Sequence, residues 1–419
     1  MTCEYCSWVN KIQAKISVGV ETKTSNNDRE KQFKHPVIIV HGGAGSIPLN
    51  ERNYMMIEVR DAAIKAYKNL AKGGSSLDAI ETAICHMESK RLFNCAKGGS
   101  LDANGEVVTD AGIMNDESNA GCVGAVRDIE HPISLAKIVL QKTSHILLVE
   151  KGAQKFALDS GIPTLQPGWF LPEVTPKEST IFETGDHEEE EDKGSSSRKP
   201  LYDPENYNLD EKEEEVSLDE KTRRVKLPWY VTRRLTDEEE QRRQEELVVE
   251  RRQRLEPTVL QVSAVGAVSF DRNGHLATGT STAGEPRKTT GTISAIGTVP
   301  GCGIFADKTG CTSVSGPDKA IYTYAPARRI VKRMAKVKSP EDGLKLELDD
   351  FENETFEAQI GAVALNSSGE SAVLFKSLHF PWAMCHEGWI YYGCTKDDMY
   401  DEEIQGLDRA DDCRCDITI

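Results

Sequence analysis

The sequence predicts one α/β domain that is interrupted once by a charged insert. Short β-branched runs such as residues 37–40 predict buried strands, and they alternate with segments in which apolar residues recur at helical spacing. Residues 186–256 are instead dense in charged side chains, so we expect no core there. A chain of 419 residues is long enough for one large domain or for two to three ordinary ones.

Strands and helices alternate through the first half of the predicted domain. The apolar spacing over residues 62–70 predicts a helix that ends at Gly73 and Gly74. Ser76 is predicted to cap a second helix over residues 77–87. Further along the chain, strands are predicted at 105–108, 121–126 and 146–149, and a helix at 135–141.

The second half of the domain contains two similar strand-and-turn segments. Residues 259–270 predict strand pairing that closes at the turn 271–274. Residues 360–365 predict another strand, which the turn 366–369 follows. The shared plan predicts neighbouring antiparallel hairpins in one sheet.

These patterns divide the chain into five regions. The predicted regions are a disordered tail at 1–34, the first half of the domain at 35–185, the charged insert at 186–256, the second half at 257–395 and an acidic tail at 396–419. The insert is expected to be disordered or partly helical.

Charge and hydropathy exclude several classes of partner. Lys and Arg number 51 against 68 for Asp and Glu, a net charge of −17, which argues against binding to nucleic acid. No apolar run is long enough to cross a bilayer, and the chain does not begin with a basic segment followed by an apolar one. We therefore expect neither a membrane span nor a secretion signal.

The cysteines indicate a reducing compartment. Eleven cysteines are present, an odd number scattered through apolar segments, so a cytoplasmic location is expected. Cys3 and Cys6 with Cys413 and Cys415 suggest a zinc site, but the imperfect spacing favours unpaired surface thiols. The acidic residues after 400 lack the spacing of a calcium loop, and a solvated tail is the favoured interpretation.

A glycine-rich turn follows the first predicted strand. Gly42, Gly43 and Gly45 lack the spacing of a dinucleotide fingerprint or a Walker loop, so a tight structural turn is favoured over a phosphate site.

Five segments in this order resemble the plant-type L-asparaginase and isoaspartyl peptidase family; they are residues 41–45, 92–94, 110–114, 264–268 and 280–284. The resemblance covers about 35–167 and 259–393. It implies a four-layer αββα sandwich of the N-terminal nucleophile hydrolase type. Members of that family are made as precursors that cut themselves just before a threonine, whose hydroxyl and new α-amine then act as nucleophile and base.

The position of that threonine is occupied here by Ala264. An alanine has no hydroxyl, so both self-cleavage and amide hydrolysis are expected to fail at this position. Ser263 carries a hydroxyl one residue earlier, but side chains alternate along a strand, so we expect it to point away from the family's site.

The resemblance implies further site residues, and this chain retains the functional groups of some of them and lacks those of others. Thr282 matches the family's second threonine, and Ser315 with Gly316 falls where Thr-Gly contributes to the oxyanion site. Thr292 and Ala295 replace the arginine and aspartate that hold the substrate's α-carboxylate and α-amine.

The resemblance also implies a structural sodium ion held by backbone carbonyls in the turn that contains Asn94. One extra residue and Lys97 in this loop weigh against the ion, which stays possible. No other cofactor is expected.

Three hypotheses follow. The first is a pseudoenzyme that acts as a homodimer or as a heterodimer with an active relative, since the family is dimeric; a small-molecule substrate is then doubtful. The second is an active amidohydrolase that releases L-aspartate from L-asparagine or β-aspartyl dipeptides through a rearranged site using Ser263, Thr282 or Ser315. The third is an interaction scaffold that uses the charged insert.

Overall fold

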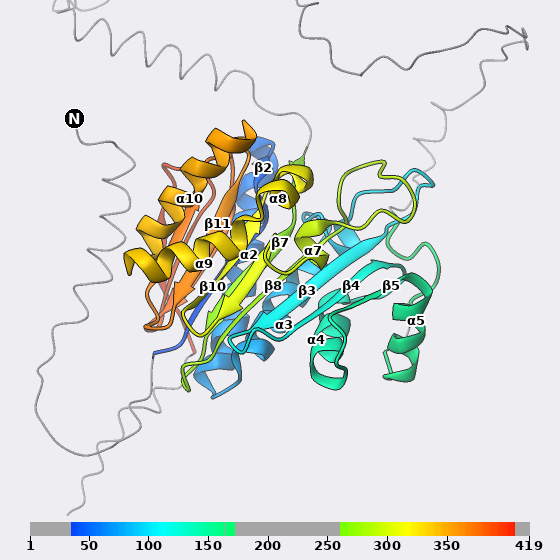
Figure 1. Ribbon diagram of the computed structural model, residues 1–419, viewed down its shortest axis with the longest axis horizontal. Helices are drawn as coiled ribbons and strands as arrows, with labels where there is room; N and C mark the ends of the chain where they lie inside the picture. The colour runs from blue at the N-terminus through cyan, green and yellow to red at the C-terminus, as the bar shows by residue number, and fades with distance from the viewer. Residues whose placement is uncertain (1–34, 163, 172–259, 407–419) are drawn as a thin grey trace, which may run out of the picture. The chain divides into compact units, whose positions relative to one another are not determined.

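A computed structural model describes residues 35–162, 164–171 and 260–406 (Figure 1). All of them belong to one compact unit. The predicted N-terminal tail, the charged insert and the four terminal cysteines lie outside the described residues.

Two sheets form the middle of this unit. The larger has nine strands in the order β15-β14-β13-β1-β7-β8-β3-β4-β5, and the smaller has four in the order β12-β11-β10-β9. The strands of the larger sheet are β1 (Val37–His41), β3 (Thr109–Asn115), β4 (Ala120–Val126), β5 (Leu147–Val149), β7 (Val265–Phe270), β8 (Leu276–Thr282), β13 (Trp382–His386), β14 (Trp389–Gly393) and β15 (Tyr400–Glu403). Those of the smaller sheet are β9 (Ile304–Asp307), β10 (Gly310–Ser315), β11 (Gly361–Asn366) and β12 (Ser371–Phe375). Neighbouring strands are antiparallel except for the parallel pair β4 and β5.

Helices cover the outer face of each sheet. The larger sheet carries α2 (Leu49–Ala71), α3 (Ser76–Glu88), α4 (Pro132–Lys142) and α5 (Glu150–Asp159). The smaller carries α8 (Asp318–Tyr324), α9 (Pro326–Val337) and α10 (Pro340–Thr355), drawn in yellow and orange in Figure 1. The order helix, sheet, sheet, helix is the four-layer αββα sandwich that the resemblance implied.

Strand β1 explains why the sequence shows an unbroken apolar run there. Ile38 and Val40 belong to the core between the larger sheet and its helices, whereas Val37 and Ile39 belong to the core between the two sheets. Successive side chains of a strand point to opposite faces. Both faces of this strand are buried, so every position is apolar.

The second helix begins one residue earlier than the sequence predicted. Ser75 is the N-cap of α3, because its Oγ accepts a hydrogen bond of 3.2 Å from the backbone N–H of Asp78. Ser76 is the first helical residue, and its own N–H donates to Asp271 Oδ2 at 3.1 Å. Two adjacent serines offer equivalent caps, and only the backbone geometry distinguishes them.

The two similar hairpins lie in different sheets, so the prediction of one shared sheet is wrong. Strands β7 and β8 pair in the larger sheet, and β11 and β12 pair in the smaller one. An inner strand of a four-layer fold is buried on both faces in either sheet, so its hydrophobic pattern does not distinguish them.

The acidic segment after residue 395 begins as part of the domain, which corrects the prediction of a tail from 396 onward. Strand β15 pairs with β14 at the edge of the larger sheet. Glu402 accepts hydrogen bonds from Arg60 at 2.6 Å and from the hydroxyl of Tyr392 at 2.5 Å. Ile404 is buried in the core beneath α2. Charged side chains are compatible with an edge strand because one side of it faces solvent.

Two further observations concern the described residues alone. The seven cysteines in them are all free. None of the described helices combines the length and the apolar character that crossing a bilayer requires.

Candidate functional site

A cavity of about 540 Å³ brings together four of the residues that the sequence singled out: Asn94, Ser263, Thr282 and Gly316. Ala264, Ser315 and the glycines of the turn are not among its lining residues. The short strand β6 (Gln261–Val262) and the residues after it form one wall. The ends of β8 and β10 supply Thr282 and Gly316, and the turn before η1 (Ala96–Gly98) supplies Asn94. Segments from both halves of the domain therefore meet at this cavity.

Ala264 lies between β6 and β7 and is fully buried. Its methyl group belongs to the apolar core that covers the smaller sheet, together with Ile296 and Val314. The chain runs from β6 through this position into β7, which pairs with β1 and β8 in the centre of the larger sheet.

Ser263 lines the cavity, contrary to the expectation that it points away from the site. Its hydroxyl donates a hydrogen bond of 2.6 Å to the carbonyl oxygen of Gly316. Its backbone N–H donates to the carbonyl of Ala44 at 3.0 Å. The expectation assumed regular strand alternation, but Ser263 and Ala264 lie between β6 and β7 and outside either strand.

Ser315 and Thr282, whose hydroxyls match those that the resemblance implies, are both buried. Ser315 Oγ accepts a hydrogen bond of 2.9 Å from the backbone N–H of Ala44. Thr282 Oγ1 accepts one of 3.0 Å from the N–H of Gly284. Each hydroxyl keeps its own hydrogen as a donor, which is the feature that an oxyanion site uses.

The glycine turn after β1 packs against the segment that leads to Ala264. Gly43 has a φ of +104°, and a Cβ there would lie 2.5 Å from the carbonyl oxygen of Ser263. A Cβ on Gly45 would lie 2.0 Å from the carbonyl oxygen of Gln261. Glycine is required at both positions because the two backbones approach closely.

Thr292 and Ala295 line a second cavity of about 460 Å³. It shares Gly284, Glu285, Ser294 and Asp318 with the first cavity, so the two adjoin. Thr292 is exposed and Ala295 is mostly buried. The two residues thus lie beside the candidate site, and neither carries a charge. That they replace the family's arginine and aspartate stays a prediction.

Asp318 is a residue of this site that the sequence analysis missed. Its carboxylate accepts hydrogen bonds from the hydroxyl of Ser294 and from the backbone N–H groups of Ala295 and Ile296, the latter two at 3.2 Å. It therefore caps the short helix α7 (Ala295–Thr298). Its position two residues after Gly316 is the feature of the sequence that could have identified it as a site residue.

Asp110, a buried acid, also forms a hydrogen bond to the segment that contains Ser294. Asp110 is completely buried and accepts hydrogen bonds from the N–H groups of Ala125 at 2.7 Å and Ser294 at 2.8 Å. Burial raises the pKa of Asp110 to about 6, although the charge of Lys288, 3.9 Å away, acts in the opposite direction. Burial also lowers the pKa of Lys288, whose Nζ donates to the carbonyl of Val108 at 2.9 Å.

The side chain of Asn94 forms hydrogen bonds across the turn at which the resemblance implies a sodium ion. The Asn94 side chain donates to the carbonyl of Gly284 at 2.8 Å and accepts from the N–H of Ser100 at 2.9 Å. The carbonyls of Phe93, Cys95 and Ala96 accept hydrogen bonds from backbone N–H groups inside the loop. Each of these oxygens keeps a second lone pair, so the sodium ion stays a prediction.

Comparison with known proteins agrees with this geometry. Residues 34–391 match the family model described as Asparaginase. The chain is 30% identical over 379 residues to an isoaspartyl peptidase/L-asparaginase of Danio rerio, covering 88% of this chain and 98% of that protein. The Bos taurus protein of the same name is 31% identical over 362 residues, with 86% and 96% covered. The Homo sapiens protein is 28% identical over 369 residues, with 87% and 97% covered.

Proposed function

The chain belongs to the asparaginase family, and from this premise we propose that it is a pseudoenzyme in which the N-terminal nucleophile hydrolase fold persists without the reaction. The observation that carries the proposal is the methyl side chain of Ala264, fully buried at the entrance to β7. The proposed role is that of a binding or regulatory partner.

The reaction of such a hydrolase needs two groups at this position. A hydroxyl must attack a carbonyl carbon, and a base must take the hydroxyl's proton. Ala264 offers no oxygen for the attack. Without the cut before residue 264, its nitrogen stays in an amide and has no basic amine to offer. The proposed loss therefore removes nucleophile and base together.

The alternative of an active amidohydrolase with a rearranged site has weaker support. The Ser263 hydroxyl is committed as a donor to the carbonyl of Gly316. In residues 35–162, 164–171 and 260–406, no Asp, Glu, His or Lys side chain hydrogen-bonds to the hydroxyls of Ser263, Thr282 or Ser315. A hydroxyl without a base at hydrogen-bonding distance is a poor nucleophile at neutral pH.

Substrate binding supports the same proposal. A zwitterionic amino acid needs a cation for its carboxylate and an anion for its amine, and each charged hydrogen bond contributes about 1.5–3 kcal/mol. Thr292 and Ala295 provide neither charge. We therefore expect weaker binding of asparagine through these two positions, whereas other charged side chains, Arg91, Glu285, Lys288 and Asp318, line the two cavities.

The proposed pseudoenzyme acts through association. A homodimer, or a heterodimer with an active family member, is the expected assembly, and the charged insert at 186–256 is a second candidate for a partner surface. The free cysteines of the described residues support a cytoplasmic setting.

The test combines two measurements on the purified full-length chain. Mass spectrometry under denaturing conditions is expected to give one species of 46.3 kDa. Incubation with L-asparagine or with a β-aspartyl dipeptide is expected to release no ammonia or aspartate above the buffer blank, with an active family member as the positive control. Two fragments, the second beginning at Ser263 or Ala264, or turnover proportional to enzyme concentration, would refute the proposal.

A further inference from the structure

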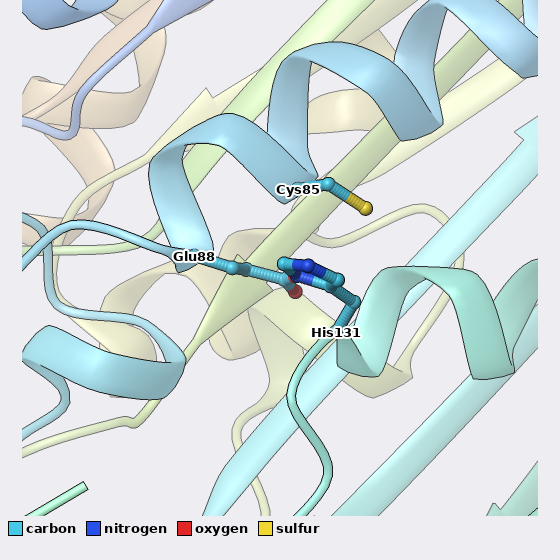
Figure 2. Close-up of side chains that lie close together, drawn as sticks. All are labelled: Cys85, Glu88 and His131. Carbon is cyan, nitrogen blue, oxygen red and sulfur yellow. The ribbon is translucent and has the colours of Figure 1, made fainter. Parts of the chain in front are cut away.

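Three metal-ligating side chains meet between α3 and α4, outside the candidate site. Cys85 and Glu88 are one turn apart on α3, and His131 directly precedes α4 (Figure 2). The Cys85 thiol sulfur, a Glu88 carboxylate oxygen and a His131 ring nitrogen all lie within 4.8 Å of one another. Within the described ranges, this is the one cluster of three or more His, Cys, Asp or Glu side chains with such spacing.

The carboxylate of Glu88 is fully buried and held in place through one of its oxygens. Oε1 accepts hydrogen bonds from the N–H of Ile133 at 3.1 Å and from the hydroxyl of Ser281 at 2.7 Å. These two bonds come from α4 and β8, so the carboxylate is positioned by two other elements of the fold.

The other oxygen of Glu88 and the facing nitrogen of His131 have no hydrogen-bond partner. Oε2 lies 3.3 Å from His131 Nδ1, and both atoms are buried without a hydrogen bond. A buried polar atom without a hydrogen bond is unfavourable, and more so when it carries charge. The two atoms face each other at ion-pair distance without forming a hydrogen bond, so both keep lone pairs that a metal ion can use once the ring nitrogen carries no proton.

The electrostatic surroundings favour a cation. Glu81 and Glu130 add negative charge near His131 and Glu88. The nearby cation Lys137 is already paired, with Asp78 and, at 2.6 Å, with Glu81. Within the described residues, no lysine or arginine forms an ion pair with the Glu88 carboxylate, whose charged neighbour is His131.

We propose that Cys85, Glu88 and His131 bind a zinc ion, or a divalent ion of similar softness. Zinc takes thiolate, imidazole and carboxylate ligands, with bonds of about 2.0–2.3 Å in a tetrahedron. Oxygen and nitrogen ligands in that geometry are about 3.3 Å apart, which matches the 3.3 Å between Glu88 Oε2 and His131 Nδ1.

Charge and access are consistent with this site. On binding, the Cys85 thiol releases its proton to solvent, and so does His131 Nδ1 where the ring is protonated. Thiolate, carboxylate and zinc together are then neutral. The His131 side chain is 30% exposed, which gives the ion a route from solvent. A water molecule supplies the fourth position, and Ser134 Oγ, 3.4 Å from Cys85 Sγ, hydrogen-bonds to the sulfur ligand. The ion then ties the end of α3 to the start of α4, independently of any chemistry at residue 264.

The test uses the full-length chain after removal of metal by a chelator under reducing conditions. Cys3, Cys6, Cys413 and Cys415 are first replaced by Ser, so that terminal thiols do not bind the probe. Calorimetric titration with Zn²⁺ is expected to show one equivalent bound. Titration with Co²⁺ is expected to give a thiolate-to-cobalt charge-transfer band.

Cys85→Ala is the decisive variant because it leaves the Glu88–His131 pair intact. It is expected to lose the cobalt band and to weaken Zn²⁺ binding at least about tenfold. Cys302→Ala, which removes a cysteine from the core of the smaller sheet, is the matched control and is expected to change neither. His131→Asn is the second variant if Cys85→Ala fails to fold. Absence of stoichiometric binding, or binding that Cys85→Ala leaves unchanged, would overturn the proposal and leave a Glu88–His131 ion pair only.

Discussion

The Ser263 hydroxyl and the Gly316 carbonyl oxygen are joined by a hydrogen bond of 2.6 Å, directly beside Ala264. The hydroxyl of the residue that precedes Ala264 is thus a donor to the backbone of Gly316. It stabilises the cavity wall rather than facing a base. A substitution at position 264 is therefore the most direct test of whether the fold still supports the family's reaction.

We expect Ala264→Thr to restore slow self-cleavage. The change returns a hydroxyl to a site where Ser315, Thr282 and the glycine turn are still in place. The larger side chain enters a fully buried position, so the variant is also expected to lose about 1–3 kcal/mol of unfolding free energy. Denaturing gels and N-terminal sequencing measure the reaction, with the second fragment beginning at residue 264.

Ala264→Val is the matched control, because valine has the shape of threonine without the oxygen. It is expected to be destabilised by the same overpacking, without the cost of a buried hydroxyl, and to remain a single chain. Cleavage in both variants would mean that strain, and not a hydroxyl, breaks the chain. Cleavage in neither would mean that the surrounding donors have also been lost.

Asp318→Ala is expected to lower the unfolding free energy by about 1–2 kcal/mol, since it removes the acceptor for the N–H groups of Ala295 and Ile296 at the start of α7. Asp318→Asn keeps one acceptor oxygen and is expected to lose less. Urea unfolding measures both. Equal stability of Asp318→Ala and wild type would show that Ser294, whose Oγ also accepts from Ile296, caps α7 alone.

The pH dependence of the free energy of unfolding is expected to show the effect of burying the His41 ring. Its Nε2 lies 2.8 Å from Ser313 Oγ, its ring stacks on Phe380, and burial lowers its pKa from 6.5 to about 3. Between pH 6.5 and about 3, His41 is therefore protonated in the unfolded chain and neutral in the folded chain. The stability that neutral His41 provides is complete above pH 6.5 and is lost as the pH falls toward about 3.

His41→Gln removes this titration and serves as the comparison. Urea unfolding between pH 6.5 and about 4 is expected to show a loss in wild type that exceeds the loss in the variant by up to about 3 kcal/mol. All other groups titrate in both proteins, so the difference isolates His41. Parallel stability curves would show that the His41 ring is protonated, or hydrated, in the folded protein.

Much of the fold was predictable because local pattern and burial agree. The strand at 37–40, the turn at Asp271 and the helix over 135–141 all appear close to their predicted bounds. The assignment of the two hairpins to one sheet failed, since strands of either inner layer are apolar on both faces. The start of the acidic tail was missed because an edge strand tolerates charge as a tail does.

The site was predictable in its chemistry and less so in its geometry. That position 264 lacks an oxygen and that Thr292 and Ala295 lack charge follow from residue identity alone. The direction of the Ser263 side chain did not follow, because the alternation rule holds only within a strand. The role of Asp318 depends on a helix start more than twenty residues earlier in the chain.

The amino-acid sequence by itself determined which atoms are available: a methyl group at 264, hydroxyls at Thr282 and Ser315, and thiol, carboxylate and imidazole at Cys85, Glu88 and His131. Only the tertiary structure decided which of these atoms meet. Long-range packing turns the Ser263 hydroxyl onto Gly316 and brings His131 to the end of α3. The reason is physical, because side-chain identity is a local property, whereas proximity between residues distant in the chain arises from the burial of shared apolar surface.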